Sequence, residues 1–380
     1  MTTLRWKKTA FLVPLVCALC AGCAQSRFPV AQSPQVYNPA LVTIPIGQFS
    51  GSPEEIGAEH GRRFHDQIID LFQNYLLPQL PGNLRVQAHL AAALFELYML
   101  PDQRTEVTAL AGAVGLNIYD AVLAQCYLDL MPITQCSTIS LPAGASPDGV
   151  ARMGRNLDFD AQGILDRHSV LMIYRPAGKY QFAAIGWPGM IGVLSGMNEY
   201  GLCLANMEVD RQMRSPDAMP YTLLYRTILE RCRTVDEAVD LLNRTPRQSA
   251  NNLMLMDANG NRAVAEIRPE GVVIRRGTPG SALISTNHQR GQDADTAGRC
   301  WRYDSLHRAA ADMYGNIDVR SLERMLSKVV QGNHGEMTIQ SMVLEPRDRV
   351  IYLATGLDAP QQRFERIDLK FYFDAATASN

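Results

Sequence analysis

The chain has 380 residues, 47 % of them hydrophobic, and a net charge of −2 from 36 Lys and Arg against 38 Asp and Glu. This balance, without a basic block, argues against nucleic acid as a partner. The length allows one large domain or two ordinary ones, and no stretch in the body approaches the ~20 apolar residues of a membrane-spanning helix.

The N-terminus has the pattern of an export signal. Three basic residues precede an apolar run over residues 10–21 that is too short to span a membrane. The run ends in Cys20-Ala21-Gly22-Cys23, which looks like the cleavage box of a bacterial lipoprotein. We therefore expect residues 1–22 to be a lipoprotein signal peptide and Cys23 to carry the lipid. The alternative is an ordinary secretory signal.

The residues after this box are polar and contain proline, so residues 23–40 are expected to form a flexible tether. Ala24, rather than Asp, follows Cys23, which favours the outer membrane in such lipoproteins. The expected location is the bacterial cell envelope, with the protein lipid-anchored at the outer membrane and facing the periplasm.

Residues 41–135 are expected to form a helical leading segment. Apolar residues recur at helical spacing over residues 54–77, and residues 87–100 are rich in Ala, Leu and Glu. A further helix is predicted from Asp102 as its N-cap, and an apolar helix over residues 119–130.

From Cys136 to about residue 375 the pattern changes to short strands with helical insertions. The expected helices cover 221–242, with a helix start at Thr234, then 303–313 and 319–330. The expected strands cover 136–140, 150–159, 170–174, 180–185, 189–195, 202–207, 253–256, 262–266, 272–276, 282–285, 337–345 and 349–355. Helices followed by a mostly antiparallel sheet predict a layered α+β fold.

Cys136 is the most informative residue. It stands in a β-prone stretch, and Pro147-Asp148-Gly149 predicts a type I turn before a second strand that carries Arg155 and Asp158. With Pro147 and Asp148 at the centre of the turn, Cys136 would lie opposite Phe159, beside Asp158. Arg155 and Asp158 have opposite parity on an ideal strand, so a bulge near Asn156 would be needed to aim both at the sulfur.

The same stretch resembles the start of the catalytic chain in N-terminal-nucleophile amide hydrolases, because Cys136-Ser137-Thr138 is followed after a hairpin by Gly154-Arg155-Asn156-Leu157-Asp158. The resemblance extends to the penicillin acyltransferase (isopenicillin N acyltransferase-like), choloylglycine hydrolase and acid ceramidase-like families. Agreement with the first of these spans residues 45–370 and rests on 52–57, His60-Gly61, 186–189, 196–202 and 286–288.

The resemblance implies a four-layer αββα sandwich, with the catalytic part over residues 136–375 separated from the leading segment by a cut before Cys136. It implies a hydrolase or acyltransferase acting on a linear N-acyl amide. No cofactor is expected, and the lack of an HExxH pattern in the sequence argues against metal catalysis. A thiol is a weak nucleophile at its usual pKa of ~8.5, but the α-amine of a chain-terminal cysteine, with a pKa of ~7.7–8.0, can act as its general base.

Other site residues follow from this chemistry. Arg155 can favour the thiolate or hold a substrate oxygen, and Asp158 can position the α-amine. Two asparagines at strand ends, Asn206 and Asn287, are candidate oxyanion donors. The resemblance also implies a later arginine, which we assign to Arg299 with Arg302 as the alternative.

Each assignment has a plainer alternative. Cys136 could be a buried strand cysteine, and Arg155 and Asp158 a surface ion pair of little energetic worth, as we expect for Arg152, Asp160 and Asp166. Asn198 competes with Asn206 but more readily shapes the turn before Gly201. At the level of the whole protein, the alternatives are an inactive lipoprotein that binds a small acylated ligand and a Cys-His hydrolase that uses His288 or His334 without self-cleavage.

The four remaining cysteines of the body could form disulfides in an oxidising compartment. None of their spacings resembles a zinc site, and we expect buried free thiols at Cys126, Cys203, Cys232 and Cys300.

Overall fold

The computed structural model describes residues 37–130, 134–209, 217–291, 300–332 and 336–374. The predicted signal peptide, the lipidation site Cys23 and most of the predicted tether lie outside these residues. Within the described part of the chain, no helix is both long and apolar enough to cross a bilayer.

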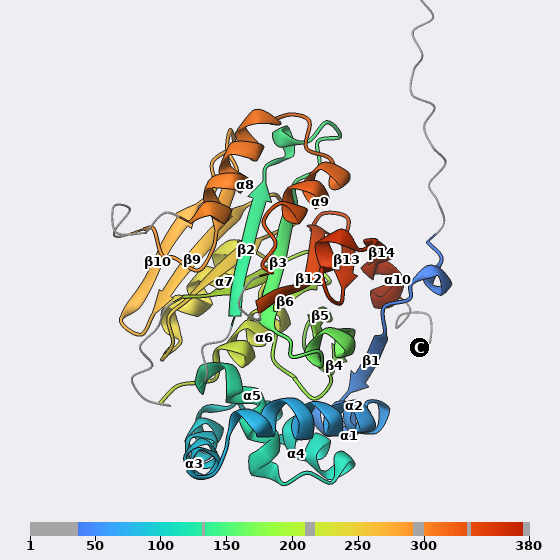
Figure 1. The fold of residues 1–380 in the computed structure, drawn as a ribbon, viewed down its shortest axis with the longest axis vertical. Coiled ribbons are helices and arrows are strands. Elements are labelled where there is room, and N and C mark those ends of the chain that lie inside the picture. Colours follow the sequence, from blue (N-terminus) through green and yellow to red (C-terminus); the bar gives the residue numbers. More distant parts are fainter. Residues whose placement is uncertain (1–36, 131–133, 210–216, 292–299, 333–335, 375–380) are drawn as a thin grey trace, which may run out of the picture. The chain divides into compact units, whose positions relative to one another are not determined.

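Two β-sheets form the centre of the described fold (Figure 1). The larger has the strand order β1-β4-β5-β6-β7-β8-β9-β10, and the smaller has the order β11-β2-β3-β12-β13-β14. Their bounds are β1 Ile46–Gly51, β2 Thr134–Leu141, β3 Arg152–Asp160, β4 Val170–Pro176, β5 Phe182–Gly186, β6 Ser195–Asn198, β7 Cys203–Glu208, β8 Asn251–Met256, β9 Arg262–Arg268, β10 Gly271–Arg276, β11 Leu283–Ser285, β12 Glu336–Glu345, β13 Val350–Thr355 and β14 Glu365–Asp368.

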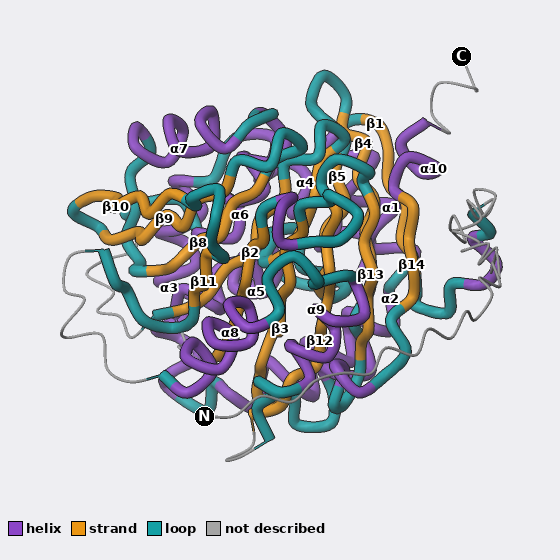
Figure 2. The backbone as a smooth tube through the Cα atoms, turned by 90° about the horizontal axis from the view of Figure 1, so that it is seen from above, coloured by secondary structure: helices purple, strands orange, loops and turns teal. Residues whose placement is uncertain are grey.

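The sheets pack face to face, with contacts between β2 and β7, and helices cover their outer faces (Figure 2). Helices α6 (Tyr221–Arg231) and α7 (Val235–Arg244) pack on the larger sheet, while α8 (Trp301–Asp312) and α9 (Val319–Ser327) pack on the smaller. The expected αββα layering is therefore confirmed. Every described strand pair is antiparallel except β1 with β4.

The leading segment supplies five α-helices and one strand. The helices are α1 Pro53–Arg63, α2 His65–Asp70, α3 Asn83–Tyr98, α4 Pro101–Val114 and α5 Ile118–Leu130. The single helix predicted over residues 54–77 is broken at Phe64, where φ is −118° and ψ is 26°, and it ends in a π-helical turn over Leu71–Leu76. Helix α4 begins at Pro101, so Asp102 is inside its first turn and is not the N-cap.

Elsewhere the predicted elements and the structure differ mainly in the strands. Residues 189–194, predicted as a strand, form a loop, because the backbone groups of Gly189 and Ile191 bind side chains of the leading segment and do not join a ladder. Strands β1 and β14 and helix α10 (Leu369–Asp374) were not predicted. The described chain also contains short 3-10 turns at Pro39–Leu41, Leu77–Gln79, Ala143–Ala145, Leu165–His168 and Ala359–Gln361.

The motif at the start of α1 has a packing reason. Ser52 and Glu55 form a capping box, with Ser52 N–H donating to the Glu55 carboxylate at 2.8 Å and Glu55 N–H donating to Ser52 Oγ at 3.3 Å. A Cβ at Gly57 would lie 2.1 Å from the carbonyl oxygen of Glu106, and one at Gly61 would lie 2.6 Å from Ala113 Cβ. These glycines let α1 lie directly against α4.

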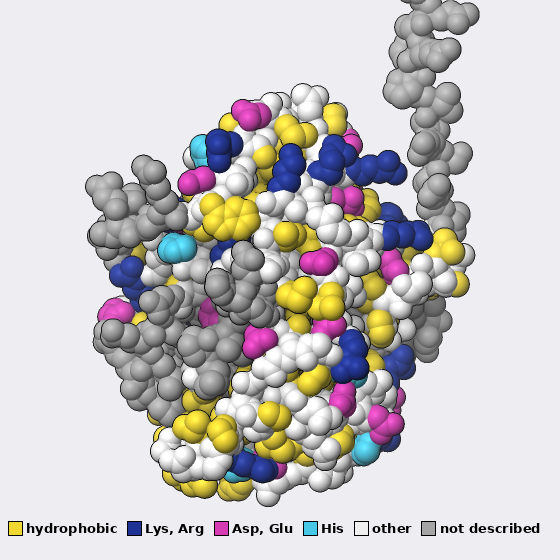
Figure 3. Space-filling model, viewed as in Figure 1, with side chains coloured by type: hydrophobic (Ala, Val, Ile, Leu, Met, Phe, Trp, Pro, Cys, Tyr) yellow, Lys and Arg dark blue, Asp and Glu magenta, His cyan; other side chains and the backbone are white. Residues whose placement is uncertain are grey.

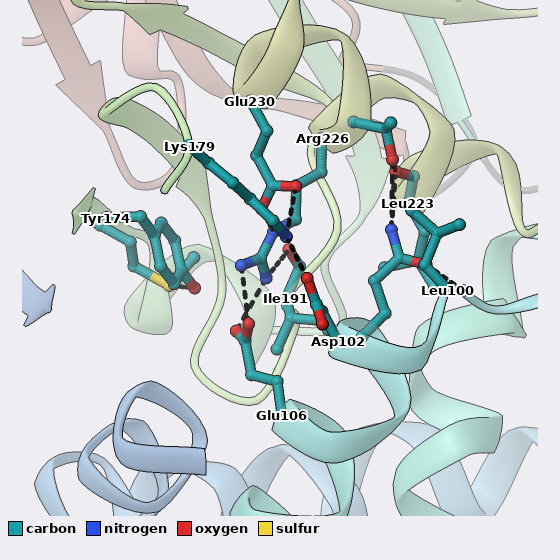
Figure 4. A network of polar contacts seen from close by, with 12 residues as sticks. Leu100, Asp102, Glu106, Tyr174, Lys179, Ile191, Leu223, Arg226 and Glu230 are labelled. Carbon is teal, nitrogen blue, oxygen red and sulfur yellow. Dashed lines mark hydrogen bonds and ion pairs between the residues drawn. The ribbon is translucent and has the colours of Figure 1, made fainter. Parts of the chain in front are cut away.

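An ionic cluster joins the leading segment to the catalytic part (Figure 4). Arg226 of α6 donates to both carboxylate oxygens of Glu106 of α4 at 2.7 Å and to Glu230 at 2.8 Å. Lys179 bridges Glu230 at 3.0 Å and Asp102 at 3.2 Å. Arg226, Glu106 and Glu230 are all buried, so this cluster fixes α4 against α6.

The outward face of α3 is apolar. Figure 3 shows hydrophobic side chains gathered at the lower edge of the view, where Figure 1 places α3. The exposed large hydrophobic residues of this helix are Leu84, Val86, Leu90, Leu94, Leu97 and Tyr98.

Candidate active site

Cys136 lies in β2 opposite Leu157 of β3, and Leu141 lies opposite Arg152. The predicted opposition of Cys136 and Phe159 is therefore wrong by two positions. The turn at Pro147-Asp148 exists, since Gly149 N–H donates to the Ser146 carbonyl at 3.2 Å. The 3-10 turn Ala143–Ala145 adds residues between the end of β2 and this turn, with no equivalent addition between the turn and β3. The register of the two strands is shifted as a result.

The shift preserves parity, so the side chain of Arg155 shares a face with that of Cys136. Arg155 Nη2 lies 3.6 Å from Cys136 Sγ, and both side chains are buried. Burial raises the pKa of the Cys136 thiol, while the Arg155 guanidinium acts in the opposite direction by favouring the thiolate. The site thus holds a thiol in a dry environment beside a positive charge.

Arg155 is fully buried. Its Nη1 donates to the backbone carbonyl of Asn206 in β7, and its Nε has no hydrogen-bond partner among the described residues. Burial lowers the pKa of Arg155, opposed by the charges of Cys136 and Asp158. The surface ion pair considered for Arg155 and Asp158 is excluded, because both side chains are buried and Arg155 is directed at a sulfur and a carbonyl.

Asp158 lies on the opposite face of β3, and the ladder between β2 and β3 is regular, so the bulge expected near Asn156 is absent there. A register shift occurs instead in the pairing of β3 with β12, between Thr338 and Gln340. The Asp158 carboxylate accepts from Thr338 Oγ1 at 2.5 Å and from Arg302 Nη1 at 2.8 Å. Arg302 thus connects the Asp158 carboxylate to the backbone carbonyl of Cys136.

Arg302, at the start of α8, connects the parts of the site. Besides Asp158, it donates to the Cys136 carbonyl at 3.1 Å, to Asn287 Oδ1 at 2.8 Å and to Gln135 Oε1 at 3.2 Å. Gln331 Nε2 donates to the same Gln135 oxygen at 2.5 Å. The two residues on either side of the predicted cut are thus held by one guanidinium.

Asn287 contacts Cys136, but with its carbonyl oxygen. Cys136 N–H donates to Asn287 Oδ1 at 3.0 Å, and Asn287 Nδ2 donates to the Glu208 carbonyl at 2.6 Å. Only this orientation of the amide matches donors with acceptors on both sides. Its N–H is therefore directed at the Glu208 carbonyl and away from Cys136, and the role of oxyanion donor expected for Asn287 stays a prediction.

Asn206 lies beside the site because its backbone carbonyl accepts from Arg155. Its side chain is buried and makes no hydrogen bond to any described residue, and its Oδ1 is among the unsatisfied buried atoms. Asn198, the alternative, shapes the turn as expected: its Oδ1 accepts from Tyr200 N–H at 3.1 Å and from Leu202 N–H at 3.0 Å.

The other predicted residues divide into three groups. Arg299, Cys23 and His334 lie outside the described residues. Arg152 is buried, bound to Asp148 and Glu345, so the surface role expected for it is wrong. The expected free thiols are confirmed, all of them buried: Cys126, Cys203, Cys232 and Cys300.

The described residues give Cys136 no histidine partner. Its side chain and backbone make hydrogen bonds to Arg155, Asn287 and Arg302, and the Asp158 backbone also hydrogen-bonds its thiol. No group of three or more His, Cys, Asp and Glu side chains in the described part of the chain could hold a metal ion. The described residues of this site supply a thiol, two guanidiniums, the Asp158 carboxylate, the Thr338 hydroxyl and several side-chain amides.

Two residues of the site, Thr338 and Gln331, were not predicted from the sequence pattern. Gln331 meets Gln135 of β2 across 196 residues of sequence, and Thr338 of β12 meets Asp158 of β3 across 180. A signal exists only for Thr338, a β-branched polar residue in a strand otherwise rich in apolar residues.

A cavity of about 100 Å³ opens near this site. Its walls are apolar and come from both parts of the chain; they include Leu71, Phe72 and Tyr127 of the leading segment and Phe159, Trp187 and Met190 of the catalytic part. Phe159, which lines the cavity, follows Leu157 by two residues and shares its face of β3, and Leu157 is paired with Cys136.

Comparison with known proteins gives distant but consistent relatives. Protein dcd1A of Dictyostelium discoideum is 22 % identical over 237 residues, covering 54 % of each chain. The N-acylethanolamine-hydrolyzing acid amidase of Caenorhabditis elegans is 23 % identical over 296 residues, covering 70 % of this chain and 79 % of the relative. The chain spans about half the length of the first curated relatives it matches.

Among solved structures, penicillin V acylase from Agrobacterium tumefaciens superposes with a TM-score of 0.47 at 15 % identity, covering 62 % of this chain and 86 % of that one. A Caenorhabditis elegans ortholog of the acid amidase gives a TM-score of 0.46 at 20 % identity, covering 61 % and 100 %. The model of the acyl-coenzyme A:6-aminopenicillanic acid acyl-transferase family matches residues 145–359. That match covers more than half of the chain, and the chain belongs to this family.

Proposed function

We propose that the protein is an amidase or acyltransferase that acts on linear N-acyl amides with Cys136 as an N-terminal nucleophile. The observation that carries this proposal is that two different side chains hold the two reactive groups of one residue. Asn287 accepts from the backbone N–H of Cys136, and Arg155 lies beside its sulfur. A buried structural cysteine needs neither contact.

The first step in this proposal is self-cleavage. The thiol of Cys136 attacks the carbonyl carbon of Gln135, the bond to the Cys136 nitrogen breaks, and a thioester and a free α-amine result. Water then hydrolyses the thioester and releases the leading segment with Gln135 at its end. Arg302 and Gln331, which bind the Gln135 side chain, would hold the carbonyl in place for this attack.

Turnover then uses the new amine as general base. The α-amine takes the thiol proton, and the thiolate attacks the acyl carbon of the substrate. The α-amine then gives that proton to the substrate's nitrogen, which leaves as a free amine. Water or another amine then accepts the acyl group from the thioester. Asn287 would hold the α-amine, Asp158 and Arg302 would fix the backbone of Cys136, and the side-chain amide of Asn206 is the candidate donor to the oxyanion.

The test is the mass and N-terminal sequence of purified protein. Wild type should consist of two pieces, the larger beginning at Cys136, and Cys136→Ala should stay whole and inactive. A single intact wild-type chain with amidase activity would exclude the self-cleaving mechanism and favour a Cys-His hydrolase. Cleaved protein that no iodoacetamide probe labels and no N-acyl amide acylates would favour an inactive binding protein.

We also propose that the protein is anchored in the outer membrane of a bacterial envelope through a lipid on Cys23, facing the periplasm. The short apolar run and the Cys20-Ala21-Gly22-Cys23 box support this location. Metabolic labelling with palmitate should mark the protein, on the leading segment once the chain is cleaved, and Cys23→Ser should abolish the label. An unlabelled protein that starts at another residue would contradict the anchor.

A further inference from the structure

The loop between β5 and β6 is held by the leading segment. Gln125 of α5 donates from Nε2 to the Gly189 carbonyl at 2.8 Å and accepts from Ile191 N–H at Oε1, at 2.9 Å. His60 of α1 accepts from Gly189 N–H at Nε2, at 3.0 Å. Three backbone groups of one loop thus bind two side chains that the proposed cleavage would place on the other piece.

The conformation of this loop depends on those bonds. Gly189 has φ +86°, a backbone conformation that side-chain-bearing residues rarely adopt, and a Cβ there would lie 3.3 Å from the Ile68 side chain. Gln125 and His60 are buried, so water cannot replace them as partners. Without these residues, the loop would lose the contacts that fix its position.

The loop in turn forms a wall of the apolar cavity. Trp187, Gly189 and Met190 line it, and the opposite wall comes from helices of the leading segment, including Ala124 of α5. Phe159, one of its lining residues, stands two positions along β3 from Leu157, the partner of Cys136, and on the same face of the hairpin. The cavity is therefore placed to receive the substituent of a carbonyl bound at the sulfur.

We propose that this cavity takes the apolar end of the substrate's acyl group, and that Gln125 and His60 are positioning residues that set its size. The inference rests on the proposed amidase function and adds the substrate class. A cavity of about 150 Å³ holds benzene, so the volume here of about 100 Å³ fits a short unbranched chain, on the order of four or five carbons beyond the carbonyl. The leading segment thereby acts as part of the binding site.

The experiment measures kcat/KM for one chromogenic amine carrying acyl groups from acetyl to decanoyl. Burial of each methylene should raise kcat/KM about fourfold until the cavity is full near hexanoyl. Gln125→Leu should reduce the hexanoyl-to-acetyl ratio at least about tenfold, which is about 1.4 kcal/mol. His60→Gln keeps an acceptor for Gly189 N–H and should retain the ratio, whereas His60→Leu should reduce it.

Gln103→Leu is the matched control. Gln103 is also a buried glutamine of the leading segment, and it donates across the same boundary to the Leu223 carbonyl at 3.3 Å and to Thr227 at 3.2 Å, away from the loop. It should lose stability but keep the acyl-length preference. Ala124→Leu removes none of these hydrogen bonds but fills the cavity, so it should lower kcat/KM more for the hexanoyl amide than for the acetyl amide. This variant tests the cavity even if Gln125→Leu does not fold.

The outcomes separate the two proposals. Wild type that cleaves none of these amides overturns the proposed function. Wild type that cleaves all of them at equal kcat/KM, an Ala124→Leu variant with an unchanged ratio, or an equal loss of the ratio in Gln125→Leu and Gln103→Leu overturns the assignment of the cavity while leaving the amidase function in place.

Discussion

Two buried arginines show how the same side chain can serve structure in one place and chemistry in another. Arg226 is surrounded by carboxylates: it binds Glu106 through two nitrogens and Glu230 through a third, and its guanidinium lies 4.9 Å from the centre of the Tyr174 ring (Figure 4). Burial opposes its charge, but Glu106 and Glu230 outweigh burial and raise the pKa of Arg226.

Arg155 is equally buried, but among the described residues no carboxylate forms an ion pair with it. Its neighbours are a thiol sulfur and a backbone carbonyl, its Nε is unpaired among the described residues, and burial lowers its pKa. A charge that is costly to bury and incompletely paired stabilises whatever anion forms beside it. The difference predicts that substitution of Arg226 should damage folding, and substitution of Arg155 should damage reactivity.

The largest expected effect is therefore on stability. Arg226→Leu leaves Glu106 and Glu230 buried without their main partner and should cost about 3–5 kcal/mol in the free energy of unfolding. Urea denaturation in the uncleaved Cys136→Ala background would measure it.

The control for this substitution replaces Arg226, Glu106 and Glu230 together by Leu. Because paired buried charges contribute little net stability, the triple variant should recover most of the loss. A cost below about 1 kcal/mol for Arg226→Leu alone would mean that the cluster does not hold α4 against α6.

Arg155→Met should have the opposite profile. The free energy of unfolding should change little, because no buried carboxylate loses a direct partner. The thiolate loses an adjacent positive charge, which typically shifts a pKa by 1–3 units, so kcat/KM should fall about 10²-fold at neutral pH. The pH dependence of alkylation by iodoacetamide would report the thiol directly, and Arg155→Lys should retain part of the reactivity. Equal reactivity of the Met variant and wild type would remove Arg155 from the mechanism.

The ionic cluster around Arg226 lies near His60, and this predicts how the free energy of unfolding responds to acid. Burial, with Arg226 nearby, lowers the pKa of His60 to about 3. In the unfolded chain, His60 should titrate near 6.5. Between these values the unfolded state binds more protons, so the free energy of unfolding should fall by about 2 kcal/mol from pH 7 to pH 5. His60→Gln should flatten this dependence, and a variant with the wild-type slope would place the acid sensitivity elsewhere.

The same contrast explains what could be predicted from the sequence. Cys136, Arg155 and Asp158 lie on one hairpin, so their proximity could be predicted from the local sequence pattern. The predicted register was wrong by two positions because of the 3-10 turn Ala143–Ala145. The bridge from Asp158 to Cys136 through Arg302 joins α8 to β2 and β3 across more than 140 residues, and local spacing contains no signal for it.

Nothing in the sequence indicated the Arg226 cluster or the Gln125 contacts for the same reason. Glu106 and Arg226 stand 120 residues apart, and a glutamine in an apolar helix is ordinarily a solvent-facing residue. The helices themselves were predictable from their period, but which buried polar groups meet between them depends on the tertiary packing.

The smallest effect separates two roles for Asn287. Its carbonyl accepts from Cys136 N–H and from Arg302. In the cleaved enzyme it should hold the α-amine, and this hydrogen bond favours the protonated form. Loss of one such bond is worth about 1 kcal/mol, so Asn287→Ala should lower kcat about fivefold. It should also lower the pKa of the amine and move the acid limb of the kcat/KM profile to lower pH.

An oxyanion donor would instead cost about 10²–10³ in kcat, with the shape of the pH profile unchanged. Full pH profiles of cleaved wild type and Asn287→Ala distinguish the two, and a pH-independent loss of that larger size would return Asn287 to the oxyanion site.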